Sequence, residues 1–176
     1  IISPNDKGGQ LFNAPAELRA LTAPLTPIQF NARFCLKTPH VHTLSFGMTE
    51  AAHVDEMLGA FPIGMPASDA DLAIERRLDA RVDALSSYDG FELDGDPSGI
   101  NIPEVLRFRR MLKCFGMREF GRYRYNMFQP ESEWFWGEFA TDEKLARVDR
   151  SRIPPGVPLI EMLREAHREL FIAKGR

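Results

Sequence analysis

Cysteine is scarce in this chain: Cys35 and Cys114 are the only two among 176 residues. Two thiols exclude a framework of several disulfides and a metal site with four thiolate ligands. Long apolar runs are missing too, because none approaches the roughly 20 residues that a membrane-spanning helix needs. No charged, apolar and cleavage-site pattern of a secretory signal precedes the first strand-like segment. We therefore expect a cytoplasmic, reducing setting and no membrane partner.

Several catalytic motifs are also absent, namely the P-loop, G-x-S-x-G and H-E-x-x-H. The length is below the roughly 250 residues of a complete (β/α)₈ barrel. The net charge is −3, with a basic excess in residues 101–176 and an acidic stretch at residues 63–100. Neither part is basic enough to predict a nucleic-acid partner. Because the chain opens with Ile1 in the middle of a strand-to-loop pattern, we interpret it as a fragment or a processed product.

Residues 1–62 alternate strand-like and helix-like segments. Residues 1–12 combine the end of an apolar strand with a loop rich in proline and glycine, and Pro27 suits the first turn of a helix through residue 36. Residues 41–46 are predicted to form a second strand, and Thr49 to cap a helix over residues 49–58. This order predicts an α/β region in which parallel strands are joined by crossover helices.

After residue 62 the apolar periodicity is only helical. Ser68 and Asp71 form an S-x-x-D capping pattern ahead of a helix. Further helices are predicted from Pro103, from about Met117 and from Pro158. The sequence therefore predicts two domains, residues 1–62 and residues 63–176, and a chain that is mostly α.

Two turns in the first domain have the composition of anion-binding loops. Ser3-Pro4-Asn5 is followed by Lys7-Gly8-Gly9, and Ser45-Phe46-Gly47-Met48-Thr49 leads into a helix. Backbone N–H groups in such turns point toward an anion at a helix start. Each turn by itself is also typical of an ordinary surface turn. Two of them on consecutive βα units favour a shared phosphate ligand, because parallel strands end on the same side of a sheet.

Residues 107–125 interleave cations with aromatic residues. The cations are Arg107, Arg109, Arg110, Lys113, Arg118, Arg122 and Arg124. We favour two amphipathic helices with an aromatic core and arginine-rich outer faces over binding to a nucleic acid. Trp134 and Trp136 are interpreted as packing anchors, and His53 and His167 as solvated side chains. No third ligand accompanies the His40/His42 pair, so no metal site is predicted.

The segments IISPNDKGGQLF and APLTPIQFNARFCLKTPHVHTLSFGMTEAAHVDEML, in this order, resemble the last two βα units of an aldo/keto reductase barrel. The resemblance implies a (β/α)₈ TIM barrel in which residues 1–12 are strand seven with its loop and residues 42–46 are strand eight. It also implies NADP or NAD as cofactor. A glutamate and asparagine pair for the adenine falls near Glu56 and Met57, where methionine supplies no amide. Carried over residue by residue, the cofactor-binding positions are Ser3, Pro4, Asn5, Lys7, Gly8, Ser45, Gly47, Met48 and Thr49.

The segments GINIPEVLRFRRMLKCFGMREFGRYRYNMF and PPGVPLIEMLREAHREL are similar to the C-terminal extension of a bacterial subgroup of this family. In that subgroup the extension is ferredoxin-like and its cysteines bind [4Fe–4S] clusters. Here the corresponding stretches, LDGDPSGI and EWFWGEFATDEKLARVDRSRIPP, contain no cysteine. We therefore expect a degenerate ferredoxin-like extension without an iron–sulfur cluster.

The resemblance also bears on function. The family's catalytic Asp, Tyr, Lys and His belong to barrel strands that would precede Ile1, so no catalytic residue is predicted in this chain. The expected function is the C-terminal portion of an oxidoreductase that reduces an aldehyde or a ketone. This portion contributes cofactor-phosphate binding and a helical cap, and the remainder of the barrel comes from the same or another chain. The alternative is a non-catalytic structural or interaction module derived from that family, and binding of a nicotinamide cofactor separates the two.

Overall fold

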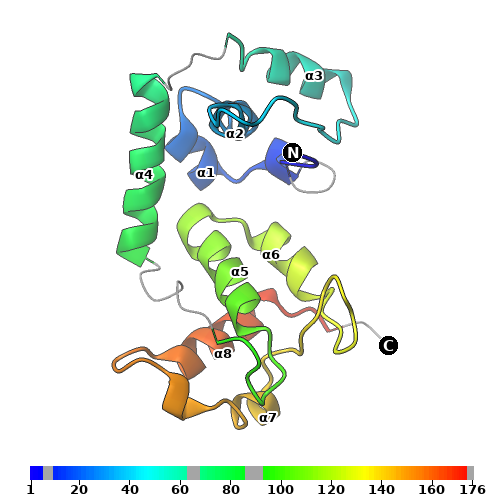
Figure 1. The fold of residues 1–176 in the computed structure, drawn as a ribbon, viewed down its shortest axis with the longest axis vertical. Helices are drawn as coiled ribbons and strands as arrows, with labels where there is room; N and C mark the ends of the chain where they lie inside the picture. The colour runs from blue at the N-terminus through cyan, green and yellow to red at the C-terminus, as the bar shows by residue number, and fades with distance from the viewer. Residues whose placement is uncertain (6–9, 63–67, 86–92, 174–176) are drawn as a thin grey trace. The chain divides into compact units, whose positions relative to one another are not determined.

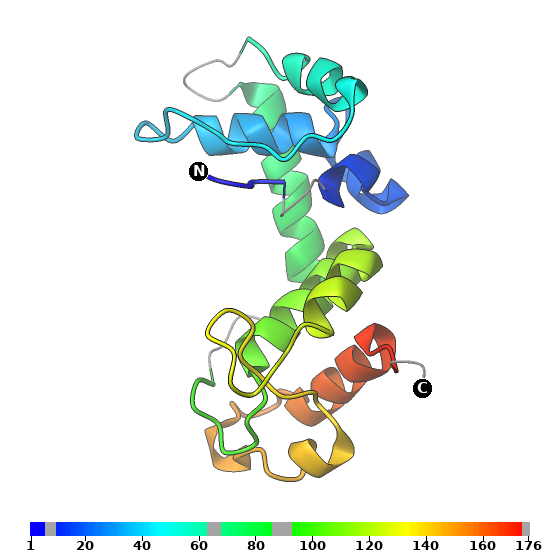
Figure 2. The same cartoon turned by 90° about the vertical axis from the view of Figure 1, so that its right-hand side faces the viewer.

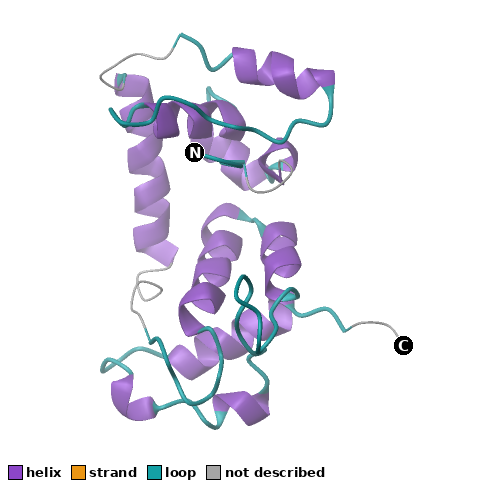
Figure 3. Cartoon of the chain, turned by 45° about the vertical axis from the view of Figure 1, so that its right-hand side comes forward, coloured by secondary structure: helices purple, strands orange, loops and turns teal. Residues whose placement is uncertain are grey.

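The computed structural model describes residues 1–5, 10–62, 68–85 and 93–173, and these are mostly helical, as predicted. Two compact units make up the chain, Ile1–Arg81 and Val82–Arg176. Figure 1 labels the α-helices of both units, and every regular element drawn among the described residues in Figure 3 is a helix. No helix within those residues is long and apolar enough to cross a membrane.

The first unit contains a short 3₁₀-helix and the beginning of a long helix that ends in the second unit. The elements are η1 (Gln10–Asn13), α1 (Ala16–Thr22), α2 (Pro27–Leu36), α3 (Ala51–Leu58) and α4 (Asp69–Leu85). Helix α2 starts at a capping box: the Thr26 side chain accepts from the Gln29 backbone N–H, and the Gln29 side chain accepts from the Thr26 N–H at 3.1 Å. With Pro27 in its first turn, α2 confirms the helix predicted from that residue.

Helix α3 starts differently from the prediction. Glu50, not Thr49, is its N-cap, and the Glu50 side chain forms no capping hydrogen bond. The Thr49 backbone N–H instead donates to Nδ1 of His53 at 3.4 Å. The ring of His53 stacks on Phe12, with centroids 3.8 Å apart and an interplanar angle of 10°. The prediction of a Thr49 cap was therefore wrong, because the helix begins one residue later. The prediction of a solvated His53 was also wrong, because the Phe12 ring of η1 partly buries the imidazole.

The two strands predicted in the first unit are also absent from the described residues. What forms is one isolated parallel bridge between Ile2 and Ser45. A pair of extended segments with no third neighbour is marginal on its own, since most backbone donors and acceptors then lack partners. A small apolar core lies nearby, built from Ile28, Ala32, Met57 and Ala60.

Helix α4 confirms the capping pattern read from the sequence. The Ser68 side chain accepts from the Asp71 N–H, and Asp71 Oδ2 accepts from the Ser68 N–H at 3.1 Å. Arg33 of α2 also forms a bidentate ion pair with Asp71, with both N–O distances at 2.7 Å. Its third nitrogen donates to the backbone oxygens of Ala60 and Pro62 at 3.0 Å each. One guanidinium thus ties α2 to α4 and to the segment after α3.

The second unit is built from helices and loops. Its elements are α5 (Ile102–Phe115), α6 (Arg118–Tyr125), α7 (Asp142–Leu145), η2 (Arg150–Arg152) and α8 (Leu159–Leu170). Asn101 caps α5 by accepting from the Glu104 N–H, and Pro103 lies in the first turn. Helix α8 begins directly after Pro158. The helices predicted around Pro103, Met117 and Pro158 are therefore confirmed.

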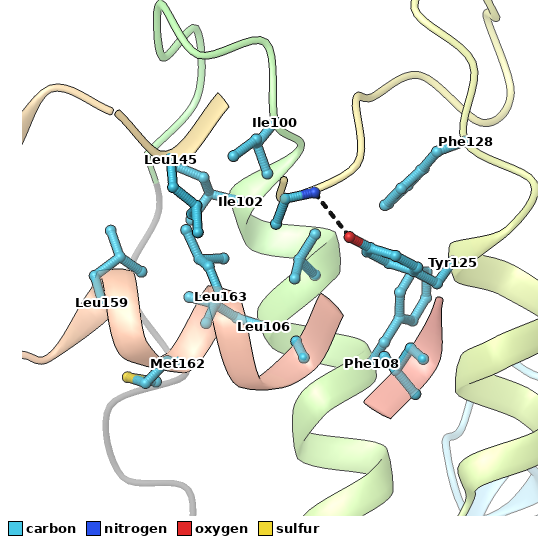
Figure 4. Close-up of a cluster of buried hydrophobic side chains, with 14 of the residues drawn as sticks. Ile100, Ile102, Leu106, Phe108, Tyr125, Phe128, Leu145, Leu159, Met162 and Leu163 are labelled. Carbon is cyan, nitrogen blue, oxygen red and sulfur yellow. Dashed lines mark hydrogen bonds between the residues drawn. The ribbon is translucent and has the colours of Figure 1, made fainter. Parts of the chain in front are cut away.

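The core of the second unit lies where α5, α6 and α8 meet. Figure 4 shows Leu163 of α8 packed toward Leu106 of α5, with the Tyr125 ring near Phe108 and Phe128. The buried residues of these three helices include Ile102, Val105, Leu106, Phe108, Phe120, Tyr125, Leu159, Met162, Leu163, Ala166 and Leu170. The predicted aromatic core is present.

The prediction that the arginines form outer faces holds only in part. Arg109 is buried, and its Nε donates to Glu165 of α8 at 2.9 Å. Lys113 pairs with the same carboxylate at 2.8 Å. Arg118 pairs with Glu169 of the same helix. These cations face acidic residues of α8, which was not visible in the pattern of residues 107–125 alone.

Gly116 ends α5 in the left-handed conformation, with φ 67°. Its N–H bonds to the Leu112 carbonyl, which is the bond of the glycine-terminated αL helix end, and the Met117 N–H bonds to the Met111 carbonyl. We expect Gly116→Ala to lower the free energy of unfolding of the second unit by about 1 kcal/mol, because a Cβ disfavours this conformation. Urea unfolding followed by tryptophan fluorescence measures the loss. Gly116→Asn, which tolerates the left-handed region better, should lose less, and equal losses for the two variants would contradict this explanation.

Candidate functional site

The two predicted anion-binding turns are brought together by the parallel bridge. The Ser45 N–H donates to the Ile1 carbonyl at 3.0 Å, and the Ser3 N–H donates to the Ser45 carbonyl at 2.8 Å. In Figure 2 the N-terminal segment runs alongside the segment that leads to α3. Because the two segments run in the same direction, the turns that follow them leave at the same end. Ser3, Pro4 and Asn5 therefore lie on the same side as the residues that follow Ser45.

Asn5 is the most buried of the predicted cofactor-binding residues, with 1% of its surface exposed. Its side-chain oxygen accepts from the Asn31 amide at 3.0 Å, and the same amide nitrogen donates to the Pro4 carbonyl at 2.7 Å. The Asn5 amide nitrogen has no hydrogen-bond partner among the residues that the structure describes. A buried N–H group without an acceptor lowers the stability of the fold. A ligand oxygen that accepts from this nitrogen would remove that penalty, and the hydrogen bond would add to the affinity of the ligand.

Ser3 holds an unusual backbone conformation for a residue with a side chain. Its φ is 53°, and it is the only non-glycine residue with positive φ in the described ranges. Such a conformation is sparsely populated, and it persists where surrounding bonds hold it, often at binding sites. Here the bond from the Ser3 N–H to the Ser45 carbonyl holds the turn.

The second turn is more open to solvent. Ser45, Gly47 and Thr49 are exposed, whereas Met48 is partly buried against the small core of the first unit. The remaining two predicted positions, Lys7 and Gly8, lie outside the described residues. The described part of the site therefore offers the hydroxyls of Ser3, Ser45 and Thr49 together with the Asn5 amide.

Sequence reasoning missed Asn31, which orients Asn5 from the middle of α2. A signal for it exists in the sequence. Asn31 follows the fully buried Ile28 by three residues, so it is a polar side chain on the helix face that carries an apolar one. Such a residue needs a polar partner, but the sequence does not indicate which one.

A pocket of about 280 Å³ also lies in the first unit. It is lined by Leu11 and Phe12, by Arg19, by residues 23–27 and by Glu56. Glu56 is the position that the family resemblance assigns to the adenine. Met57, the other such position, is buried in the core and contributes nothing to this lining.

The tryptophans of the second unit do not behave alike. Trp134 is 82% exposed, so its prediction as a packing anchor was wrong. Trp136 is more covered, and both line a second pocket of about 260 Å³ with Asn101, Glu104, Arg107, Phe108, Arg124, Phe128 and Phe135. The loop that carries them folds on its own hydrogen bonds instead of packing its indoles into the core.

A histidine predicted to be solvated is also partly buried in the second unit. Nδ1 of His167 lies 2.8 Å from the hydroxyl of the fully buried Tyr125, which itself accepts from the Ala140 N–H at 2.8 Å. Burial lowers the pKa of His167, and the Asp142 carboxylate opposes this effect. Burial also raises the pKa of Tyr125 above its ordinary value, although the Ala140 N–H lowers it. The solvated assignment of His167 was wrong because α8 packs its ring against Tyr125 and Phe171.

Within the described residues, no group of three or more His, Cys, Asp or Glu side chains is placed to hold a metal ion.

Comparison with family models, with curated proteins and with solved structures finds no match for the chain. The relationship to aldo/keto reductases therefore stays a prediction.

Proposed function

We propose that this chain is part of a nicotinamide-dependent oxidoreductase that resembles aldo/keto reductases and reduces aldehydes or ketones. In this proposal residues 1–62 bind the phosphates of NADP or NAD, and residues 63–176 form a helical cap. The observation that carries the proposal is the parallel bridge between Ile2 and Ser45, because it joins the two turns that the resemblance assigns to the cofactor.

The donors available at the two turns suit phosphate oxygens. Hydroxyls of Ser3, Ser45 and Thr49 can each donate one hydrogen bond, and the unpartnered amide nitrogen of Asn5 adds another. Asn31 keeps the Asn5 oxygen occupied, so the nitrogen is the part of the Asn5 amide that is left to bind a ligand. When bound, the cofactor supplies the hydride, while these residues bind and orient its phosphate end.

The catalytic acid and its partners are not assigned to this chain. The family's Asp, Tyr, Lys and His would come from the remainder of the barrel, in the same or another chain. The partners of this chain in the proposed enzyme are therefore that remainder, the cofactor and a carbonyl substrate.

The test is a calorimetric titration in which NADPH or NADH is added to the protein that contains this chain. In the variant Gly47→Glu a carboxylate lies at the exposed turn beside the phosphates, and we expect affinity to fall by at least about tenfold through like-charge repulsion. Thr38→Glu is the matched control, because it adds the same charge at an exposed residue beyond the end of α2 and should leave affinity unchanged.

Two results would overturn the proposal. One is no binding of either dinucleotide at millimolar concentration, which favours the non-catalytic interaction module. The other is equal loss of affinity in Gly47→Glu and Thr38→Glu, which would mean that the dinucleotide binds through general electrostatics and not at this turn.

A further inference from the structure

The second unit carries an aromatic pocket that the proposed function does not use. Its floor includes Phe108 and Phe128, whose ring centroids lie 5.7 Å apart and which are both drawn in Figure 4. Phe135, Trp134 and Trp136 add three more aromatic side chains to the lining. Five aromatic residues around about 260 Å³ form a surface suited to a flat ring.

The loop that presents the two indoles is held in shape by its own hydrogen bonds. The Ser132 hydroxyl accepts from the N–H groups of Trp134 and Phe135 at 3.2 and 2.9 Å. Gln129 bonds through its N–H to the Phe135 carbonyl and through its carbonyl to the Gly137 N–H. Trp134 is therefore exposed on an ordered loop, and a rigid exposed aromatic side chain binds at a low cost in conformational entropy.

The polar part of the lining favours an anion. Asn101 is the N-cap of α5 and accepts from the Glu104 N–H, so the start of this helix at the pocket already has its own partners. The guanidinium groups of Arg107 and Arg124 lie in the same lining. Arg107 is held by Glu104 one turn earlier, in a pair whose side chains are both well exposed. Such exposed pairs are weak, so a bound carboxylate can share this arginine.

The charges around the pocket argue against a long polyanion. Neighbouring cations that could continue a track for phosphates are already engaged, since Arg109 and Lys113 pair with Glu165 and Arg118 pairs with Glu169. The loop itself contributes exposed carboxylates at Glu131 and Glu133. A strand of nucleic acid would meet these carboxylates, whereas a small ligand with a single negative charge would not.

We propose that this pocket binds a small aryl carboxylate, with its ring among the aromatic side chains and its carboxylate at Arg107 and Arg124. Both tryptophans of the chain lie at this pocket, so its occupancy can be followed by intrinsic fluorescence. The pocket shares no residue with the two turns of the proposed cofactor site, and its test involves no nicotinamide.

The experiment uses 3-phenylpropanoate as probe and three analogues of matched size. These are 3-phenylpropan-1-ol, 3-phenylpropylammonium and 3-cyclohexylpropanoate, which remove the charge, invert it and remove the aromatic ring. We expect saturable quenching with 3-phenylpropanoate below about 10 mM and at least about tenfold weaker binding of the alcohol, because hydrogen bonds to an ionised group are the stronger ones. The ammonium analogue should bind more weakly still.

Two variants locate the site. Arg107→Gln is expected to weaken binding of 3-phenylpropanoate by about fivefold or more and to leave binding of the alcohol unchanged, since only a carboxylate uses the guanidinium. Arg147→Gln is the matched control, because Arg147 also forms an exposed pair with a glutamate one turn earlier but is absent from the pocket lining. The Arg147→Gln variant should bind 3-phenylpropanoate with the same affinity as the unaltered chain.

Several outcomes would overturn the inference. Equal binding of all four probes would show general apolar adsorption, and equal losses in Arg107→Gln and Arg147→Gln would show a nonspecific charge effect. Tighter binding of oligo-dT than of 3-phenylpropanoate, with a steep dependence on salt, would assign the surface to single-stranded nucleic acid. Absence of any fluorescence change with 3-phenylpropanoate up to about 10 mM would remove the site altogether.

Discussion

The variant Asp71→Asn is expected to lower the free energy of unfolding of the first unit by about 3 kcal/mol. Arg33 and Asp71 form a bidentate pair whose side chains are only 15% and 8% exposed. Removing one charge from a largely buried pair leaves the other charge buried without its counterion. The resulting loss of stability is larger than the net stability that the intact pair contributes. Asparagine keeps the size of the side chain and one oxygen that can still accept from the Ser68 N–H, so the change removes the charge and one of the two acceptors of the bidentate pair.

Hydrogen exchange is the right measurement because the first unit contains no tryptophan or tyrosine. Peptides from α2 should exchange faster in Asp71→Asn, by a factor that reports the change in stability. Lys37→Gln is the control, because it breaks the more exposed Lys37–Glu75 pair between the same two helices and should cost less than about 1 kcal/mol. If both variants exchange alike, the Arg33–Asp71 pair does not hold the unit together.

The same pair predicts how the first unit responds to acid. The Arg33 hydrogen bonds lower the pKa of Asp71 below its ordinary value, with the Ser68 bonds adding to the effect and burial opposing it. A carboxylate whose pKa is lower in the folded state contributes stability above the pKa of the unfolded chain and loses it as the pH falls. In the unaltered chain we expect the protection of α2 against hydrogen exchange to decline below about pH 4. In Asp71→Asn this decline should be absent.

Local signals were the part of the structure that could be predicted from sequence. The S-x-x-D pattern at Ser68 and the prolines at positions 27 and 103 each fix a helix start through residues within one turn, and each start is present. The strand predicted at residues 41–46 depended on β-propensity, which needs partners that propensity does not provide. Among the described residues, only Ser45 of this segment forms a bridge, and the Thr43 carbonyl accepts from the amino group of Ile1.

Contacts between distant residues could not be predicted. Asn31 and Asn5 are 26 positions apart, and Arg33 and Asp71 are 38 apart, so no spacing rule links them. Trp134 shows the opposite error, in which residue type predicted burial but the loop geometry turned the indole outward. The candidate phosphate turns were identified from local composition, whereas the Asn31 side chain that orients one of them required the fold.

Removal of one hydroxyl group should weaken the second unit. The Tyr125 oxygen accepts from the Ala140 N–H and lies 2.8 Å from Nδ1 of His167 (Figure 4 draws the bond from Ala140). Tyr125→Phe leaves a buried N–H without an acceptor, and we expect a loss of about 1–3 kcal/mol in urea unfolding followed by tryptophan fluorescence. Tyr123→Phe, at an exposed residue of the same helix, should change stability by less than about 0.5 kcal/mol.

The pH dependence of these variants tests the burial of the two titratable side chains. Because burial lowers the pKa of His167, its neutral form stabilises the fold, and this contribution is lost as the pH falls below about 6.5. His167→Gln should remove that decline. Because burial raises the pKa of Tyr125, the unfolded chain ionises first above about pH 10, and Tyr125→Phe should remove the corresponding alkaline loss. Unchanged acid and alkaline limbs in both variants would show that the pair only fills space.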